Sequence, residues 1–259
     1  MDAWTIHGGR LGAARGAWPD APAPWLDLST GINPRPWDAG KAGPIDWHAL
    51  PDESALADLE AAAADAFGIA RDRLCAVPGS EIGLRLLATL GLPGPVRHLV
   101  PGYRTHAEAF VGSEPIARAA LSDAAGTLLL ASPGNPDGLS VAPADLPRSG
   151  WRIIDEAFAD AMATPSLFVD DGRTIVLRSF GKFFGLAGVR LGFVAAPRDL
   201  IARLRDRLGA WPVSAAAIAI GTAAYADTGW IAATRARLPL DAAALDRVLR
   251  RRGLTPVRA

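Results

Sequence analysis

The sequence contains a single cysteine, Cys75, and no net charge. One cysteine excludes an internal disulfide and any metal site built from several cysteines, and it fits a reducing compartment. We expect Cys75 to be a small, buried and unreactive thiol. The 27 Lys and Arg residues balance the 27 Asp and Glu residues. This balance argues against nucleic acid or an anionic membrane as the main partner.

Targeting signals and long apolar runs are also absent. The N-terminus has no basic segment followed by an apolar run, so no signal peptide is evident. The most apolar stretch, residues 215–226, is too short to cross a bilayer and is interrupted by Gly221 and Thr222. We therefore expect a soluble, cytoplasmic protein. Its 259 residues are enough for a large core in one or two domains.

Three regions differ in their residue patterns. Residues 1–50 are rich in Gly, Pro and Trp without a sustained period, which predicts an N-terminal arm. Because tryptophan is costly to leave in water, this arm should pack on a surface. Residues 51–228 carry helical and strand patterns and should form a large domain. Residues 229–259 are largely helical, with Pro239 expected to kink or divide the helix, and should begin a smaller domain. The tryptophans of the arm are Trp4, Trp18, Trp25 and Trp37.

Helix signals frame the large domain. Asp52 is a plausible N-cap and Gly68 a plausible end for one helix, and Ser214 may cap another. Five apolar runs predict strands at 96–100, 127–132, 151–155, 174–180 and 191–195. Most of these runs are apolar throughout, which suits strands that are buried on both faces of a mostly parallel sheet. We predict a three-layer α/β/α domain whose ligand lies at the carboxyl ends of the strands.

The fourth run contains the hydroxyl of Ser179 near its end and is followed by the amine of Lys182 and the guanidinium of Arg190. Lysine attacks aldehydes, and Ser with Arg can hold a phosphate dianion. Pyridoxal 5'-phosphate presents both groups. A helix also opens after a Pro-Gly turn, where backbone N–H groups and the helix dipole can cradle phosphate. The residues of this opening are Gly79, Ser80 and Glu81.

Other loops supply parts that the same cofactor needs. Asp155 ends a strand, where a carboxylate can keep a pyridine nitrogen protonated. Asn135 in a Gly-Asn-Pro-Asp-Gly turn can donate to the phenolate oxygen of the ring, and Tyr103 can stack on the ring. Each has an ordinary alternative: a capping aspartate, an Asn-Pro turn and a packing aromatic.

As a set, these residues resemble the fold-type I pyridoxal-phosphate enzymes of the aspartate aminotransferase superfamily. The key motif is Ser-x-x-Lys with an arginine eight residues after the lysine, and the resemblance covers about residues 27–258. It implies Lys182 and Asp155 as catalytic residues, the lysine linked covalently to the cofactor and the aspartate at the pyridine nitrogen. It implies Tyr103 on the ring, Asn135 at the ring oxygen and a homodimer. The implied phosphate ligands are Gly79, Ser80, Ser179 and Arg190.

Within the superfamily, the chain resembles the histidinol-phosphate aminotransferases and, more closely, the threonine-phosphate decarboxylase family of cobalamin biosynthesis. The resemblance lies in residues 7–9, 27–34 and 177–188, and in Phe158, where aminotransferases commonly have tyrosine. The family implies loss of CO₂ from O-phospho-L-threonine, giving (R)-1-amino-2-propanol O-2-phosphate. The implied contacts to this phosphorylated substrate are His7, Gly8 and Asn33, with Arg104 and His106 as weaker candidates.

Two alternatives stay open. A site that turns Cα–H rather than the carboxylate perpendicular to the cofactor ring would transaminate, as a histidinol-phosphate aminotransferase does. Members of this branch usually continue past position 259 with a portion that carries a substrate-binding arginine. We therefore expect a C-terminally shortened chain, and the second alternative is a homologue that binds the cofactor without turnover.

Overall fold

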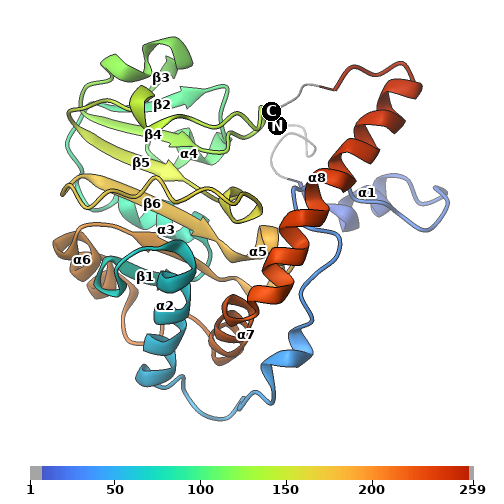
Figure 1. Cartoon of the computed structure of the whole chain (residues 1–259), viewed down its shortest axis with the longest axis horizontal. Helices are drawn as coiled ribbons and strands as arrows, with labels where there is room; N and C mark the ends of the chain where they lie inside the picture. The colour runs from blue at the N-terminus through green and yellow to red at the C-terminus, as the bar shows by residue number, and fades with distance from the viewer. Residues whose placement is uncertain (1–7, 257–259) are drawn as a thin grey trace.

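The computed structural model describes residues 8–256, and a seven-stranded sheet forms its centre (Figure 1). The strand order is β1-β7-β6-β5-β4-β2-β3. Strands β2 to β6 pair in parallel, whereas β7 is antiparallel to both β1 and β6. The predicted, mostly parallel sheet is confirmed. The strands are β1 (Leu74–Val77), β2 (Val96–Val100), β3 (Glu114–Ala117), β4 (Thr127–Ala131), β5 (Trp151–Asp155), β6 (Thr174–Ser179) and β7 (Gly192–Ala195).

Helices cover both faces of the sheet, because alternate side chains of each strand enter two different cores. In β4, Leu128 and Leu130 pack into the core that holds α2 (Glu53–Phe67) and α7 (Ala215–Ala226). Leu129 points the opposite way, into the core formed with α3 (Ser80–Ala88) and α6 (Arg198–Leu208). Burial on both faces explains why the strands read as continuous apolar runs. The three-layer α/β/α architecture is confirmed.

Capping residues fix the ends of α2 and α7, the two helices that share one core. The carboxylate of Asp52 accepts a hydrogen bond from Ser54 N, and Gly68 ends α2 in the left-handed conformation at φ 68°. Ser214 accepts from Ala217 N at the start of α7. Because each cap satisfies an otherwise free amide, it sets where the helix begins.

The last helix, α8, runs without interruption from Thr228 to Arg251, so Pro239 does not divide it. Proline removes one backbone donor, but the helix continues on both sides of it. In Figure 1, α8 lies along one side of the sheet domain. The shorter helices are α1 (Leu11–Ala17), α4 (Arg104–Ala109) and α5 (Phe180–Phe183). The 3₁₀ turns are η2 (Ala39–Ala42), η3 (Arg71–Arg73), η4 (Arg118–Asp123), η5 (Pro143–Asp145), η6 (Ala159–Ala161) and η7 (Ala187–Val189).

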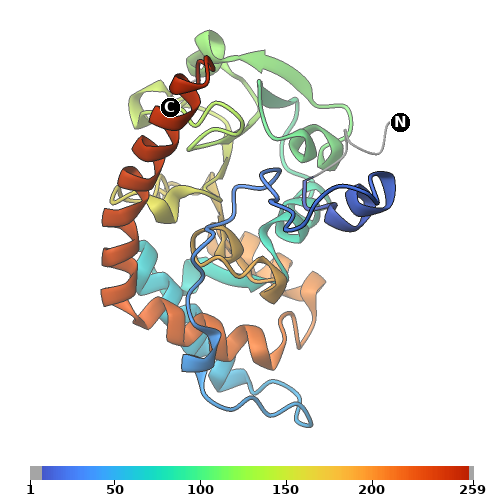
Figure 2. The ribbon, with the colours of Figure 1, turned by 90° about the vertical axis from the view of Figure 1, so that its right-hand side faces the viewer.

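The described part of the N-terminal region, residues 8–50, passes over the surface of the sheet domain (Figure 2). Trp37 anchors it in the core beside α2 and α7, with 1% of its surface exposed. Trp18 remains 53% exposed. Trp4 lies outside the described residues.

The burial of Cys75 and the character of the helices can be examined within residues 8–256. Cys75 is buried as predicted, and burial raises the pKa of its thiol to about 12. Within this range, no helix has the combination of length and apolar character that a membrane crossing requires.

Candidate active site

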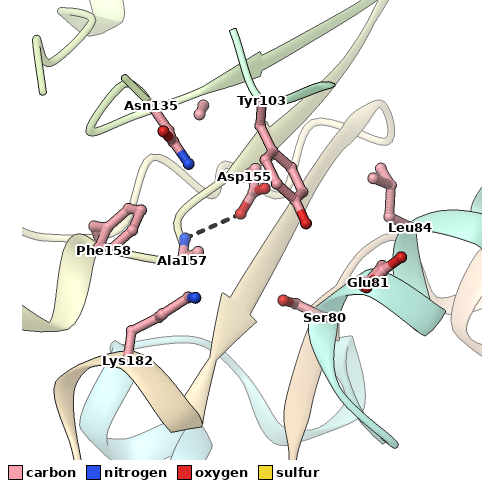
Figure 3. Close-up of a pocket in the computed structure, with 10 residues that line it drawn as sticks. Ser80, Glu81, Leu84, Tyr103, Asn135, Asp155, Ala157, Phe158 and Lys182 are labelled. Carbon is pink, nitrogen blue, oxygen red and sulfur yellow. Dashed lines mark hydrogen bonds between the residues drawn. The ribbon is translucent and has the colours of Figure 1, made fainter. Parts of the chain in front are cut away.

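A cleft lies at the carboxyl ends of β4, β5 and β6 (Figure 3). This is the edge of the sheet where the sequence pattern predicts a ligand. The cleft brings together six of the predicted residues from five separate segments. Its lining consists of Ser80, Glu81, Leu84, Tyr103, Ala131, Asn135, Asp155, Ala157, Phe158 and Lys182.

Lys182 lies on α5, the single helical turn that directly follows β6, and its amine points into the cleft. Burial lowers the pKa of this amine. The carboxylate of Asp155 acts in the opposite direction, and the guanidinium of Arg190 lowers the pKa further. A lowered pKa increases the fraction of neutral amine, which is the nucleophilic form.

Asp155 ends β5 and is held from two sides. Its Oδ1 accepts a hydrogen bond of 3.0 Å from Ala157 N, and its Oδ2 lies 3.2 Å from Nε2 of His106. His106 is 1% exposed, so it is neither solvated nor open to a substrate. The sequence offers His106 as a weaker candidate for a substrate contact, and its buried contact with Asp155 corrects that expectation. Arg104, the other weaker candidate, is exposed and does not line the cleft.

The residues predicted to hold phosphate converge at the start of α3. Gly79 occupies the N-cap position at φ 95° and gives the helix no side-chain cap. A Cβ on Gly79 would lie 2.6 Å from Nη2 of Arg190, so the glycine leaves room for this guanidinium. Ser179 pairs with Gly192 across β6 and β7, and a Cβ on Gly192 would overlap the backbone nitrogen of Ser80. Amide, hydroxyl and guanidinium donors therefore meet at one helix N-terminus.

The predicted substrate contacts lie in the N-terminal region. Asn33 is 7% exposed, and its backbone N–H donates to Lys182 O at 3.0 Å. Gly8 lies against Ser29, whose carbonyl a Cβ on Gly8 would overlap, and Gly8 is not part of the cleft lining. His7 lies outside the described residues. Of the two described residues, Asn33 lies at the lysine turn and Gly8 lies against Ser29, and the substrate roles of His7, Gly8 and Asn33 stay predictions.

Phe158 lines the cleft, although the sequence did not predict it as a site residue. Its ring centroid lies 5.9 Å from Nζ of Lys182. The N-terminal segment passes so close to this ring that a Cβ on Gly31 would lie 2.7 Å from its Cε1. In the sequence, Phe158 is only a marker of the family resemblance. Leu84, Ala131 and Ala157 carry no sequence signal that separates them from ordinary core residues.

The donor set fits pyridoxal 5'-phosphate. The Lys182 amine matches the aldehyde, the Asp155 carboxylate matches the pyridine nitrogen, and the side chain of Asn135 points into the cleft where it can donate to the ring oxygen. Gly79 leaves room for the guanidinium of Arg190 at the start of α3, where this cation and the backbone amides can hold the phosphate. Clusters of at least three His, Cys, Asp or Glu that could bind a metal are absent from residues 8–256.

Comparison with known proteins identifies the family. The family model described as aminotransferase class I and II matches residues 113–259. A threonine-phosphate decarboxylase from Sinorhizobium sp is 38% identical over 96% of this chain and 82% of its own length. One from Pseudomonas aeruginosa is 36% identical over 96% of this chain and 80% of its own length.

A solved structure has the same fold. The crystal structure of histidinol-phosphate aminotransferase from Sinorhizobium meliloti in complex with pyridoxal 5'-phosphate superimposes with a TM-score of 0.67 at 23% identity. The match covers 80% of this chain and 65% of that chain. The predicted cofactor agrees with this family and with the donor set of the cleft. The chain belongs to the class I and II aminotransferase family.

Proposed function

We propose that the protein is a pyridoxal-phosphate-dependent decarboxylase that converts O-phospho-L-threonine to (R)-1-amino-2-propanol O-2-phosphate, a step of cobalamin biosynthesis. The observation that carries the proposal is the 36–38% identity to two threonine-phosphate decarboxylases along 96% of the chain. In the reaction, the bond between the α-carbon and the carboxylate breaks, CO₂ leaves, and a proton takes its place on the α-carbon.

The cofactor, when bound, supplies a ring that accepts the electrons of the broken bond. Lys182 holds the cofactor through its amine and later returns a proton to the α-carbon of the substrate. Asp155 keeps the proton on the pyridine nitrogen, because its carboxylate is buried, hydrogen-bonded and fixed in direction by Ala157 N and His106. Asn135 donates to the ring oxygen and Tyr103 packs against the ring.

The phosphate of the cofactor is held at the start of α3. The backbone amides of Ser80 and Glu81, the hydroxyl of Ser179 and the guanidinium of Arg190 are its proposed donors. The phosphate of the substrate requires a second set of donors, for which we propose His7, Gly8 and Asn33. We further propose a homodimer.

The test is a spectrum of the protein with pyridoxal 5'-phosphate, before and after borohydride, for the wild type and Lys182→Ala. A visible band that borohydride abolishes in the wild type, and that Lys182→Ala lacks, is expected. Tyr103→Phe is a matched control, because it retains the ring and the lysine.

The substrate is then tested with O-phospho-L-threonine. We expect CO₂ release in amounts equal to the amine product, without consumption of 2-oxoglutarate. Consumption of 2-oxoglutarate without CO₂ would replace the proposal with a transaminase. A borohydride-sensitive band with neither reaction would identify a homologue that binds the cofactor without turnover.

A further inference from the structure

Lys182 is carried by an element that is too short to be stable alone. Helix α5 spans only Phe180–Phe183, and a single helical turn has no independent stability in water. The last carbonyls of a helix also lack partners within the helix. The direction of the Lys182 side chain therefore depends on what holds these carbonyls.

Residues 33–37 of the N-terminal region hold them. The backbone N–H of Asn33 donates to Lys182 O at 3.0 Å, and the side-chain Nδ2 of Asn33 donates to Phe183 O at 2.9 Å. The backbone N–H of Trp37 donates to Phe184 O at 2.9 Å. Three consecutive carbonyls are thus satisfied by a segment about 150 residues away in sequence.

The amide of Asn33 has only one orientation that fits its neighbours. Its Oδ1 accepts hydrogen bonds of 3.1 Å from the backbone N–H of Arg35 and from Nη2 of Arg237 on α8. Because both of these partners are donors, the oxygen must face them, and Nδ2 must face Phe183 O.

The N-terminal segment is fixed on its other side as well. Trp37 is 1% exposed, and its Nε1 donates to Asp227 at 3.1 Å. Gly185, at φ 70°, permits the close approach, since a Cβ there would lie 2.7 Å from Asn33 O. The segment is therefore a rigid support rather than a loose strand lying over the turn.

We propose that Asn33 is a positioning residue for Lys182. Asn33 caps the carbonyls of the lysine turn and so fixes the direction of the lysine amine. The inference rests on the proposed role of Lys182. It gives Asn33 a function that precedes substrate binding and that operates in the protein without cofactor.

The test compares the reactivity of Lys182 in four variants of the protein without cofactor. Asn33→Leu removes all three side-chain hydrogen bonds of Asn33, to Phe183 O, Arg35 N and Arg237 Nη2, with a side chain of similar shape and without a charge change. Gly185→Ala leaves Asn33 intact but forces it away from the turn. Arg35→Ala is the control for the first, because its side chain is 67% exposed. Gly172→Ala is the control for the second, because its φ of 78° brings similar backbone strain into open space.

Acetylation of Lys182 as a function of pH, followed by mass spectrometry, gives the apparent pKa of its amine. Burial now lowers this pKa, while Asp155 and Arg190, which also act on it, are unchanged in all four variants. We expect Asn33→Leu and Gly185→Ala to raise it toward that of a free lysine. The same variants should capture pyridoxal 5'-phosphate about tenfold more slowly or worse, and both controls should match the wild type.

An unchanged pKa and an unchanged capture rate in both variants would overturn the proposal. A rise in KM for O-phospho-L-threonine alone, with the pKa of Lys182 unchanged, would make Asn33 only a substrate contact and would also overturn it. If Asn33→Leu does not fold, Gly185→Ala decides. The acetylation experiment needs neither cofactor nor substrate, so failure of the wild type to bind pyridoxal 5'-phosphate would reject the proposed function separately.

Discussion

Nε2 of His106 lies 3.2 Å from Oδ2 of Asp155, although 49 residues separate them. His106 is 1% exposed, and the other oxygen of Asp155 is engaged by Ala157 N. The carboxylate proposed to meet the pyridine nitrogen is thus aligned by two partners on its far side. Removing one of them should reduce the affinity for the cofactor more than it reduces the stability of the fold.

We expect His106→Leu to reduce the affinity for pyridoxal 5'-phosphate about tenfold, since a hydrogen bond to a buried charged group contributes about 1.5–3 kcal/mol. Fluorescence titration of the cofactor is the measurement. His98→Leu is a suitable control, because His98 also makes a side-chain hydrogen bond, to Ser113 at 2.9 Å, outside the cleft lining. Equal affinities of the two variants would contradict this role of His106.

The two charges that act on Lys182 should shift its pKa in opposite directions. The negative charge of Asp155 raises this pKa, so Asp155→Asn should lower it further. The positive charge of Arg190 lowers it, so Arg190→Met should raise it. Both shifts can be measured from the pH dependence of Lys182 acetylation without cofactor. No shift in either variant would show that burial alone controls the pKa of the amine, and shifts of the same sign would contradict the prediction.

Gly79→Ala should damage the proposed phosphate site. The new Cβ would lie 2.6 Å from Nη2 of Arg190, at a φ of 95° that favours glycine. We expect at least a tenfold loss of affinity for pyridoxal 5'-phosphate, because the guanidinium must move. The affinity for pyridoxal, which lacks the phosphate, should change much less. Gly91→Ala is the control: its φ is 64°, but no atom lies within 4 Å of the new Cβ. A similar loss in both variants would point to backbone strain instead.

Arg178→Met should destabilise the whole domain. Arg178 is 4% exposed and donates to Glu156 at 2.7 Å and to Asp160, which are both buried. Its loss leaves two buried carboxylates without their cation, which typically costs about 3–5 kcal/mol. Urea unfolding measures the change in the free energy of unfolding. Arg71→Ala should cost less than about 1 kcal/mol, because Arg71 and Asp65 form a largely exposed pair.

The chemistry-bearing loops were predictable because they follow recognisable strands. The predicted strand at 174–180 includes Ser179 near its end and is followed by Lys182, so the positions of both residues at the end of a buried strand follow from local pattern. The same reasoning placed Asp155 at the end of β5. The class of cofactor and the family also follow from these residues and their spacing.

Two strands were missed for physical reasons. The run of β1, Leu74–Val77, is only four residues long, and such a run is equally compatible with a helix until its pairing with β7 is known. β3 is an exposed edge strand that contains Pro115, and its composition is that of a loop. Neither strand has a signal that is independent of its neighbour in the sheet.

The supporting contacts of the site were not predictable either. His106 meets Asp155, and Asn33 meets Phe183 O, only because the fold brings distant segments together. Residues 8–50 have no sustained period, so their sequence does not indicate which surface they contact. The position of a residue that only supports a distant site residue cannot be predicted from the spacing of motifs in the sequence.

The reversal of β7 has a consequence for how the site tolerates change. A link between parallel strands must return to the opposite rim of the sheet, whereas the β6–β7 link is a wide hairpin that starts and finishes on one rim. Ser179, Lys182 and Arg190 can therefore share that one link. Insertions into it would disturb the amine and the guanidinium at once, while insertions into the crossovers at the far rim would leave both in place.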